Sequence, residues 1–428
     1  CRYEATEDNR LVAIRRSAEQ LIMHILSSRQ NDAPDAIRPV WHIQEAVWPA
    51  LTLPEFEHAK LNKFDLTLLP LSRIGQMEGK SGSLVLIGYF SVEYPERLYS
   101  HPLVIKTLDR SKSNKLRLEY DHALTIKPFT YDRKDNFAIP IFLDEQQSGY
   151  DILWSIYSAT SAISEDGAAP ISKVKDLREP IVRCDNEQVQ HVMDNVFDLL
   201  KNCHRRFGRS SRKESALGNE YEWYLRGMWD ESGGKWGQKW QDVWGTVDQK
   251  FIKSSIGMRI NPLWVVEKLK PMERPMYMGA IHGDLHPGNV ILRDRSSPAI
   301  IDFGWAQNCA HIAKDFVLLE CNLRFLMLRT EVRTDELEDF ASWVGWNSAP
   351  PDRLGEYLRE RAGLIVQLRA KAAAVFPDDT NWDEEYLAPL FLVAMGLLRF
   401  APQLGNQLMA IRFVEATANA LADVFKWD

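Results

Sequence analysis

Two short motifs, close together in the chain, restrict its fold more than any other feature of the sequence. HGDLHPGN occupies residues 282–289, and IDFG occupies residues 301–304. Between them, β-rich runs at residues 290–292 and 299–301 flank a polar turn, which predicts a hairpin. The start of one strand of an antiparallel hairpin lies beside the end of the other. The pattern therefore predicts that the end of the first motif lies next to the second.

The side chains at these positions suit a site for magnesium and a nucleotide. The amide oxygen of Asn289 and the carboxylate of Asp302 could supply part of the octahedral oxygen shell of Mg2+, with water and phosphate oxygens completing it. Asp284 would lie beside the same phosphates, where it could orient an acceptor hydroxyl and take its proton. The segment therefore predicts ATP and Mg2+ as ligands.

The order Asp-x4-Asn, strand, Asp-Phe-Gly is also the arrangement of kinases. HGDLHPGNV (residues 282–290) and IIDFGWA (residues 300–306) together resemble the aminoglycoside phosphotransferase and choline kinase group of the protein-kinase-like superfamily. The resemblance implies roles for four residues: Asp284 as the catalytic base, Asn289 and Asp302 as magnesium ligands, and His282 as an orienter of the loop. It also implies that Asp315 braces this loop from the next helix. For His286, packing and a role in the site both stay open.

The pattern of apolar and polar residues along the sequence divides the chain into three parts. Residues 1–64 include an amphipathic pattern from Asn9 to about Ser28, which predicts an N-terminal helical segment. Residues 65–160 contain short β-rich runs between Gly, Pro and Ser. Residues 161–428 have helical periodicity, interrupted only by the hairpin. This pattern predicts an α+β, protein-kinase-like bilobal fold with a small antiparallel β N-lobe and a larger helical C-lobe that carries the catalytic loop and the metal site.

Individual elements follow from the same patterns. The predicted strands of the β lobe cover residues 84–90, 103–107, 138–142 and 152–158. The clearest predicted helices of the C-lobe cover residues 189–207 and 352–375. The segment at residues 152–159 is expected to contact adenine between the lobes, with a core strand as the alternative.

Further nucleotide contacts are predicted in the β lobe. Glycines let backbone N–H groups approach phosphates closely, and a Gly- and Ser-rich turn precedes the first strand. Its candidate residues are Gly75, Gly79, Ser81, Gly82 and Ser83. The spacing is one residue short of a P-loop and continues as a strand, and it does not match G-x-G-x-x-G either. An ordinary Gly-rich turn is the alternative.

Lys106, in Val-Ile-Lys, resembles the strand lysine of kinases that holds the α- and β-phosphates. Glu119, in the helical pattern LRLEY, is the best candidate for its partner. Without the downstream motifs, both residues would be interpreted as solvated charges.

Composition argues against several other classes of protein. A formal net charge of −7 without a basic tract argues against nucleic-acid binding. Five cysteines without a C-x-x-C pair argue against a disulfide framework and a zinc site, and they favour the reducing cytoplasm. The longest apolar run, residues 386–398, is broken by Pro389 and is too short to cross a membrane, so a buried helix is predicted.

The acceptor is predicted to be a small molecule. Kinases that act on polypeptides have a long segment after Asp-Phe-Gly, closed by Ala-Pro-Glu. Here about ten residues separate Gly304 from Asp315, and no Ala-Pro-Glu follows. A group of aromatic and acidic residues could hold a cationic ligand, with helix packing as the alternative. These residues are Trp223, Trp229, Asp230, Glu231, Trp236, Trp240, Asp242 and Trp244.

Three functions stay open from sequence alone. The leading hypothesis is a phosphotransferase that uses ATP and Mg2+ to move the γ-phosphate to a hydroxyl of a small molecule. The second is a nucleotide-binding regulatory module of a larger bacterial conflict or signalling protein, acting on a protein or as a pseudokinase. The chain begins with Cys1 rather than Met, which predicts a fragment with fused or partner domains N-terminal to it. The third, a degenerate kinase fold that binds nothing, is disfavoured by the intact motifs.

Overall fold

The chain divides into two compact units. The computed structural model describes residues 3–4, 63–68, 84–93, 98–109, 114–129, 141–144, 150–156, 175–205, 212–228, 237–254, 257–292, 297–346, 348–399 and 406–427. Unit 1 consists of Cys1–Lys175 and Ile291–Ala306, and unit 2 consists of Asp176–Val290 and Gln307–Asp428. The helix predicted from Asn9 lies outside the described residues, and the predicted domain boundaries at residues 64 and 160 stay predictions.

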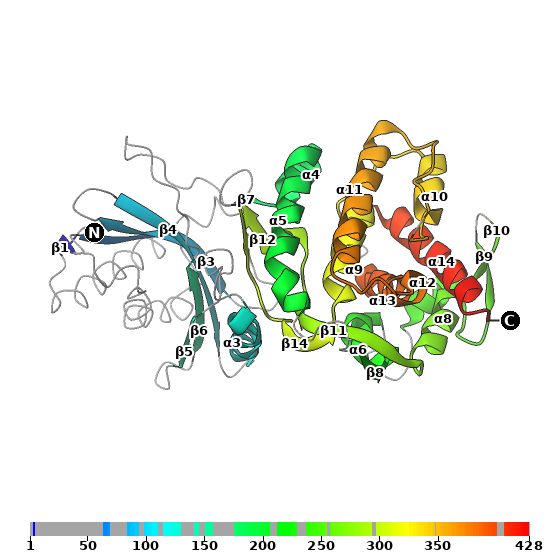
Figure 1. Ribbon diagram of the computed structural model, residues 1–428, viewed down its shortest axis with the longest axis horizontal. Helices are drawn as coiled ribbons and strands as arrows, with labels where there is room; N and C mark the ends of the chain where they lie inside the picture. The colour runs from blue at the N-terminus through cyan, green and yellow to red at the C-terminus, as the bar shows by residue number, and fades with distance from the viewer. Residues whose placement is uncertain are drawn as a thin grey trace. The chain divides into compact units, whose positions relative to one another are not determined.

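Unit 1 is built on a six-stranded sheet in which all neighbouring strands are antiparallel, in the order β1-β2-β3-β4-β6-β5 (Figure 1). The strands are β1 (Tyr3–Glu4), β2 (Lys63–Leu68), β3 (Leu84–Glu93), β4 (Leu98–Asp109), β5 (Ile141–Asp144) and β6 (Tyr150–Ile156). Each of the four predicted strands overlaps one of them. Helix α3 (Lys115–Ile126) contacts β4, β5 and β6, and it buries Leu116, Ala123 and Ile126. This spacing of buried residues is that of one helical face.

Unit 2 is mostly helical. Its helices of at least six residues are α4 (Arg178–Arg183), α5 (Asn186–His204), α6 (Leu217–Leu225), α7 (Gln238–Trp244), α8 (Pro262–Leu269), α9 (Ala313–Cys321), α10 (Thr334–Ser342), α11 (Glu356–Ala373), α13 (Leu387–Leu397) and α14 (Gln407–Val424). The helices predicted at residues 189–207 and 352–375 correspond to α5 and α11. Together, the small antiparallel sheet of unit 1 and the helices of unit 2 confirm the predicted α+β fold class.

Helix α13 forms the centre of unit 2, since all of its residues are buried and it contacts α6, α9 and α14. Pro389 is tolerated because it lies in the first turn, where the missing N–H has no helical partner in any case. The prediction of a buried helix at this apolar run is therefore confirmed. None of the helices within the described ranges combines the length and the hydropathy that crossing a bilayer requires.

The hairpin between the two motifs is present, with strands β12 (Val290–Leu292) and β13 (Pro298–Ile300). It forms a three-stranded sheet in the order β13-β12-β7, where β7 is Lys175–Asp176. The prediction that the hairpin is the only β structure in the helical part is wrong. The other strands there are β8 (Arg212–Ala216), β9 (Phe251–Ser254), β10 (Gly257–Ile260), β11 (Glu273–Ile281) and β14 (Gln307–His311).

The missed strands lack the alternating pattern on which strand prediction depends. Strand β11 pairs with β8 on one side and β14 on the other, and its last six residues are all buried. A strand that is covered on both faces shows no alternation of polar and apolar residues. Its neighbours β8 and β14, with the sequences RKESA and QNCAH, are too polar to be recognised as strands.

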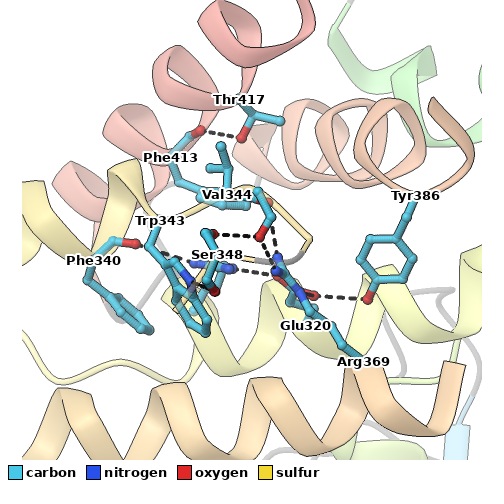
Figure 2. A network of polar contacts seen from close by, with 11 residues as sticks. Glu320, Phe340, Trp343, Val344, Ser348, Arg369, Tyr386, Phe413 and Thr417 are labelled. Carbon is cyan, nitrogen blue, oxygen red and sulfur yellow. Dashed lines mark hydrogen bonds and ion pairs between the residues drawn. The ribbon is translucent and has the colours of Figure 1, made fainter. Parts of the chain in front are cut away.

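A buried ionic network joins α9 to α11 and to Tyr386, the residue that precedes α13 (Figure 2). Glu320 accepts hydrogen bonds from Arg324 Nε at 2.7 Å, from Arg369 Nη2 at 2.9 Å and Nε at 3.1 Å, and from the Tyr386 hydroxyl at 2.9 Å. Burial opposes ionisation of Glu320, but the two guanidinium groups lower its pKa to about 2. One carboxylate thus stabilises two buried cations, Arg324 and Arg369. Both guanidinium groups also lie over the ring of Trp343.

Gly396 allows close packing between α13 and α6, and a substitution there tests this packing. A Cβ at this position would overlap with the backbone carbonyl of Tyr224. We expect Gly396→Ala to lower the free energy of unfolding by about 1–3 kcal/mol, measured by denaturant titration. Gly363, in α11, is the matched control because a Cβ there meets nothing within 4 Å. Gly363→Ala should raise stability by up to about 1 kcal/mol, and equal effects of the two substitutions would contradict this description of the packing.

Candidate functional site

The segment after β11 forms a loop whose backbone is held from several sides. Gly283 has a positive φ of 79°, a conformation that glycine adopts at little cost. His286 caps the short helix Pro287–Asn289, since its Nδ1 accepts a hydrogen bond from Gly288 N at 3.0 Å. Asn289 N donates to His286 O at 2.9 Å. These contacts give residues 282–289 a defined conformation.

Asp315, at the start of α9, braces this loop. Its carboxylate accepts hydrogen bonds from the backbone N–H of His282 at 3.0 Å and of Gly283 at 2.8 Å. It also lies 2.9 Å from His204 Nε2, at the end of α5, and both side chains are fully buried. Burial raises the pKa of Asp315, but the contacts with His204, His282 and Gly283 outweigh it and lower the pKa overall. A charged carboxylate therefore fixes the start of the loop.

Asp284 and Asn289 both lie in this loop, and Asn289 is its last residue. The Asn289 side chain is buried and donates from Nδ2 to Asp284 O at 2.9 Å, so its amide oxygen is the end turned away from that carbonyl. The Asp284 side chain is 30% exposed, and His286 Nε2 lies 3.9 Å from its Oδ2. His286 thus caps the short helix and also faces the carboxylate. The loop presents an accessible carboxylate next to an oriented amide.

In unit 1, Lys106, Glu119 and Asp302 form a second group of charged side chains. Lys106 lies on β4, between β3 and β6, and its Nζ is 2.6 Å from Glu119 Oε1 and 3.2 Å from Asp302 Oδ1. Burial lowers the pKa of Lys106, but the charges of Asp302 and Glu119 outweigh it, so the pKa is raised overall. Burial and the charge of Asp302 raise the pKa of Glu119 to about 7, although Lys106 opposes this.

The backbone around Asp302 is unusual. Asp302 has a φ of 63°, which is uncommon for a residue other than glycine. His122, one turn after Glu119 on α3, makes a hydrogen bond of 2.6 Å between its Nδ1 and Gly304 O. Helix α3 therefore contacts this segment directly through His122 and, by way of Lys106, through Glu119. Asp302 is a candidate metal ligand, and strained backbone conformations are more frequent at functional sites than elsewhere.

The donor set fits magnesium. Within the described ranges, no group of three or more His, Cys, Asp or Glu side chains could form a metal cage of protein ligands alone. Mg2+ usually takes only one or two protein ligands and fills its shell with water and phosphate oxygens. Asp302, with 40% of its side chain exposed, and the amide oxygen of Asn289 are donors of the right kind. They belong to different units, so their convergence on one ion stays a prediction.

Some predicted residues cannot be placed. Gly75, Gly79, Ser81, Gly82 and Ser83 lie outside the described residues, as does the end of the expected adenine-binding segment. Of the tryptophan group, Trp240 and Trp244 are buried and stack on each other at 5.9 Å, as the packing alternative expects. Trp223 is 49% exposed. The remaining two tryptophans, at positions 229 and 236, lie outside the described ranges.

Three residues that hold the site were missed from sequence. His204 contacts Asp315, His122 contacts Gly304, and the hydroxyl of Tyr224, on α6, donates to Gly283 O at 2.6 Å. No spacing rule connects these positions to the motifs, because each lies far away in the chain. His204 ends an amphipathic helix with its side chain on the buried face, and this was the one available signal.

Comparison with known families agrees with the motifs. Residues 184–319 match the family model described as the phosphotransferase enzyme family. This range contains both motifs and the bracing Asp315, so the predicted resemblance to phosphotransferases is confirmed over this range. It supports a kinase-like phosphotransferase as the type of enzyme. Residues 257–399 also match a family described as ternary complex associated domain 9. No curated protein matches the chain significantly.

Solved structures of small-molecule kinases align with most of the chain, at low TM-scores. Amicoumacin kinase hAmiN, in complex with AMP-PNP, Ca2+ and Ami, is 11% identical with a TM-score of 0.40, covering 89% of this chain and 93% of its own. Choline kinase LicA from Streptococcus pneumoniae is 10% identical with a TM-score of 0.40, covering 89% and 99%. A microcompartment-associated aminopropanol kinase is 11% identical with a TM-score of 0.31, covering 83% and 95%.

Proposed function

We propose that this protein transfers the γ-phosphate of ATP to a hydroxyl group of a small molecule. The observation that carries the proposal is the family match at residues 184–319, because the predicted base and both predicted metal ligands fall within it. The described geometry supports it, since Asp284 is partly exposed on a loop whose backbone is held by a buried carboxylate. Precise positioning of this kind is what phosphoryl transfer requires of a protein.

Each residue has a defined task in this reaction. Asp284 orients the acceptor hydroxyl and takes its proton as the hydroxyl oxygen bonds to the γ-phosphorus and the bond from that phosphorus to ADP breaks. Lys106, held by Glu119, pairs with the phosphates of the nucleotide. Asn289 and Asp302 would hold Mg2+, which neutralises charge on the β- and γ-phosphates when bound. His282 gives the backbone N–H that anchors the loop to Asp315.

The acceptor and the compartment follow from the same proposal. The short segment between Gly304 and Asp315 leaves no platform for a polypeptide, which favours a small-molecule acceptor. All four described cysteines are free, and ATP is abundant in the cytoplasm, so we place the reaction there.

Nucleotide binding is tested by substitution of Asp302. We expect ATP with Mg2+ to raise the melting temperature of the parent protein, by an amount equivalent to about 2.7 kcal/mol when the ligand is at 100 times its Kd. Asp302→Ala removes a metal ligand and should abolish this shift. Asp335→Ala is the control because this exposed aspartate pairs only with surface residues in the described structure, and it should keep the shift. An unchanged shift in Asp302→Ala would contradict the assigned role.

A second candidate function has one specific observation in its favour. The match of residues 257–399 to a family named for a ternary complex suits a nucleotide-binding module that works within an assembly. Such a module would bind ATP with Mg2+ but would transfer phosphate to a protein or not at all. Incubation with γ-labelled ATP and a panel of small hydroxyl compounds separates the two, since only the leading proposal expects a labelled small molecule.

A further inference from the structure

Two buried tyrosines on α6 form hydrogen bonds through their hydroxyl groups with different parts of unit 2. Tyr224 donates to Gly283 O, in the loop, at 2.6 Å. Tyr221, one turn earlier on the same helix, makes a 2.7 Å hydrogen bond with His311 Nδ1 on β14, away from that loop. Tyr221 is 0% exposed and Tyr224 is 5% exposed. The two side chains are therefore matched in chemistry, burial and helix, and they differ in what they hold.

The contact with Gly283 affects the peptide group that leads directly into Asp284. This peptide group consists of the Gly283 carbonyl and the Asp284 N–H. Tyr224 holds the carbonyl, and His282 Nδ1 accepts the N–H at 3.3 Å. The preceding N–H of Gly283 is held by Asp315. Rotation of the peptide group at Asp284 would break bonds on both of its sides.

Gly283 is the point at which such rotation would be easiest. Its positive φ of 79° belongs to a region that glycine enters and leaves with little steric resistance. Without a partner for its carbonyl, the backbone here could sample several conformations. Each of these would aim the Asp284 carboxylate differently, and small errors in the aim of a reacting group cost large factors in rate.

Helix α6 is well suited to hold this carbonyl because it cannot easily shift. Its contact with the fully buried α13 is so close at Gly396 that a Cβ there would overlap with Tyr224 O. The phenol ring of Tyr224 also lies 6.1 Å from that of Tyr221, centroid to centroid. The hydroxyl is thus presented from a part of the core that is rigidly packed.

We propose that Tyr224 is a positioning residue for Asp284, acting through the Gly283 carbonyl. The proposal rests on the proposed function, in which Asp284 is the catalytic base. Tyr224 is buried, and its hydroxyl donates to the backbone carbonyl of Gly283 rather than to a residue assigned to the nucleotide. Its loss should therefore slow the chemical step without weakening nucleotide binding.

The test compares Tyr224→Phe with Tyr221→Phe, each of which removes one oxygen atom and keeps the ring. The readout is ATP turnover with Mg2+, with water as the acceptor. We expect Tyr224→Phe to lower kcat about tenfold with an unchanged KM for ATP, since it leaves a buried acceptor without its partner. Tyr221→Phe should lower the free energy of unfolding by about as much as Tyr224→Phe does, but its kcat should stay within about twofold of that of the parent protein. Equal kcat values in the two variants would overturn the proposal.

Amide hydrogen exchange gives a second readout that does not depend on activity. Exchange in peptides covering residues 282–286 should be faster in Tyr224→Phe than in the parent protein and in Tyr221→Phe. Unchanged exchange would overturn the proposal, whatever the kinetics. If the parent protein turns over ATP neither with water nor with the panel of hydroxyl compounds, the proposed function fails, and faster exchange in Tyr224→Phe alone would still support the role of Tyr224 in holding the loop.

Discussion

Asp284→Asn is expected to lower ATP turnover by a factor of about 10² to 10⁴, which is the usual contribution of a general base. The amide keeps the size and the planar shape of the carboxylate but cannot take a proton from the acceptor. Binding should be retained because the loop is held through its backbone, by Asp315 and by the Asn289 side chain, and neither contact uses the Asp284 carboxylate. The measurement is steady-state turnover of ATP with Mg2+.

The melting temperature with and without ATP and Mg2+ provides the control for this variant. A retained shift together with lost turnover would separate catalysis from binding, as the assigned role of Asp284 requires. Turnover equal to that of the parent protein would exclude Asp284 as the base. Loss of both turnover and binding would indicate that Asp284 helps to hold the nucleotide.

Glu320→Gln is expected to lower the free energy of unfolding by about 3–5 kcal/mol, measured by denaturant titration. Glu320 is the one carboxylate that pairs with both Arg324 and Arg369 in the described structure, and all three side chains are at least 95% buried. Its loss leaves two guanidinium groups without their counter-charge in a medium that solvates them poorly. Glu267→Gln removes a carboxylate from an exposed pair with Lys270, and it should cost less than about 1 kcal/mol.

The same network predicts the direction of an acid effect. The pKa of Glu320 falls from 4.5 to about 2 on folding, so its contribution to stability is complete above pH 4.5 and is lost as the pH falls toward 2. The stability of the parent protein should therefore decrease in this range more steeply than that of Glu320→Gln. Parallel pH profiles for the two proteins would contradict the ionised state of Glu320.

The motifs were sufficient to predict the fold class and the hairpin because local sequence determines both. A strand, a turn and a strand follow one another between residues 290 and 300, and the kinase-like order of motifs restricts what surrounds them. The β-rich runs of unit 1 were recognisable because Gly, Pro and Ser separate them. Strand β11 was missed because burial on both faces removes the alternation that identifies a strand.

The supporting contacts of the site could not be predicted because they depend on tertiary packing. Tyr224 reaches Gly283 from α6, which packs tightly against Gly396, and nothing near Tyr224 in the sequence indicates this contact. His204 likewise meets Asp315 from a distant helix. The roles of Asp284, Asn289, Asp302 and Lys106 at a nucleotide remain predictions, although each side chain has a geometry that suits its role.

The most direct test of the central claim is an experimental structure with Mg2+ and a non-hydrolysable ATP analogue. The account predicts one Mg2+ ion coordinated at about 2.1 Å by the Asp302 carboxylate and the Asn289 amide oxygen, with phosphate oxygens in the same shell. Lys106 should contact the phosphates, and Asp284 should face the γ-phosphate. A nucleotide bound elsewhere, or a metal ion that contacts neither Asn289 nor Asp302, would contradict it.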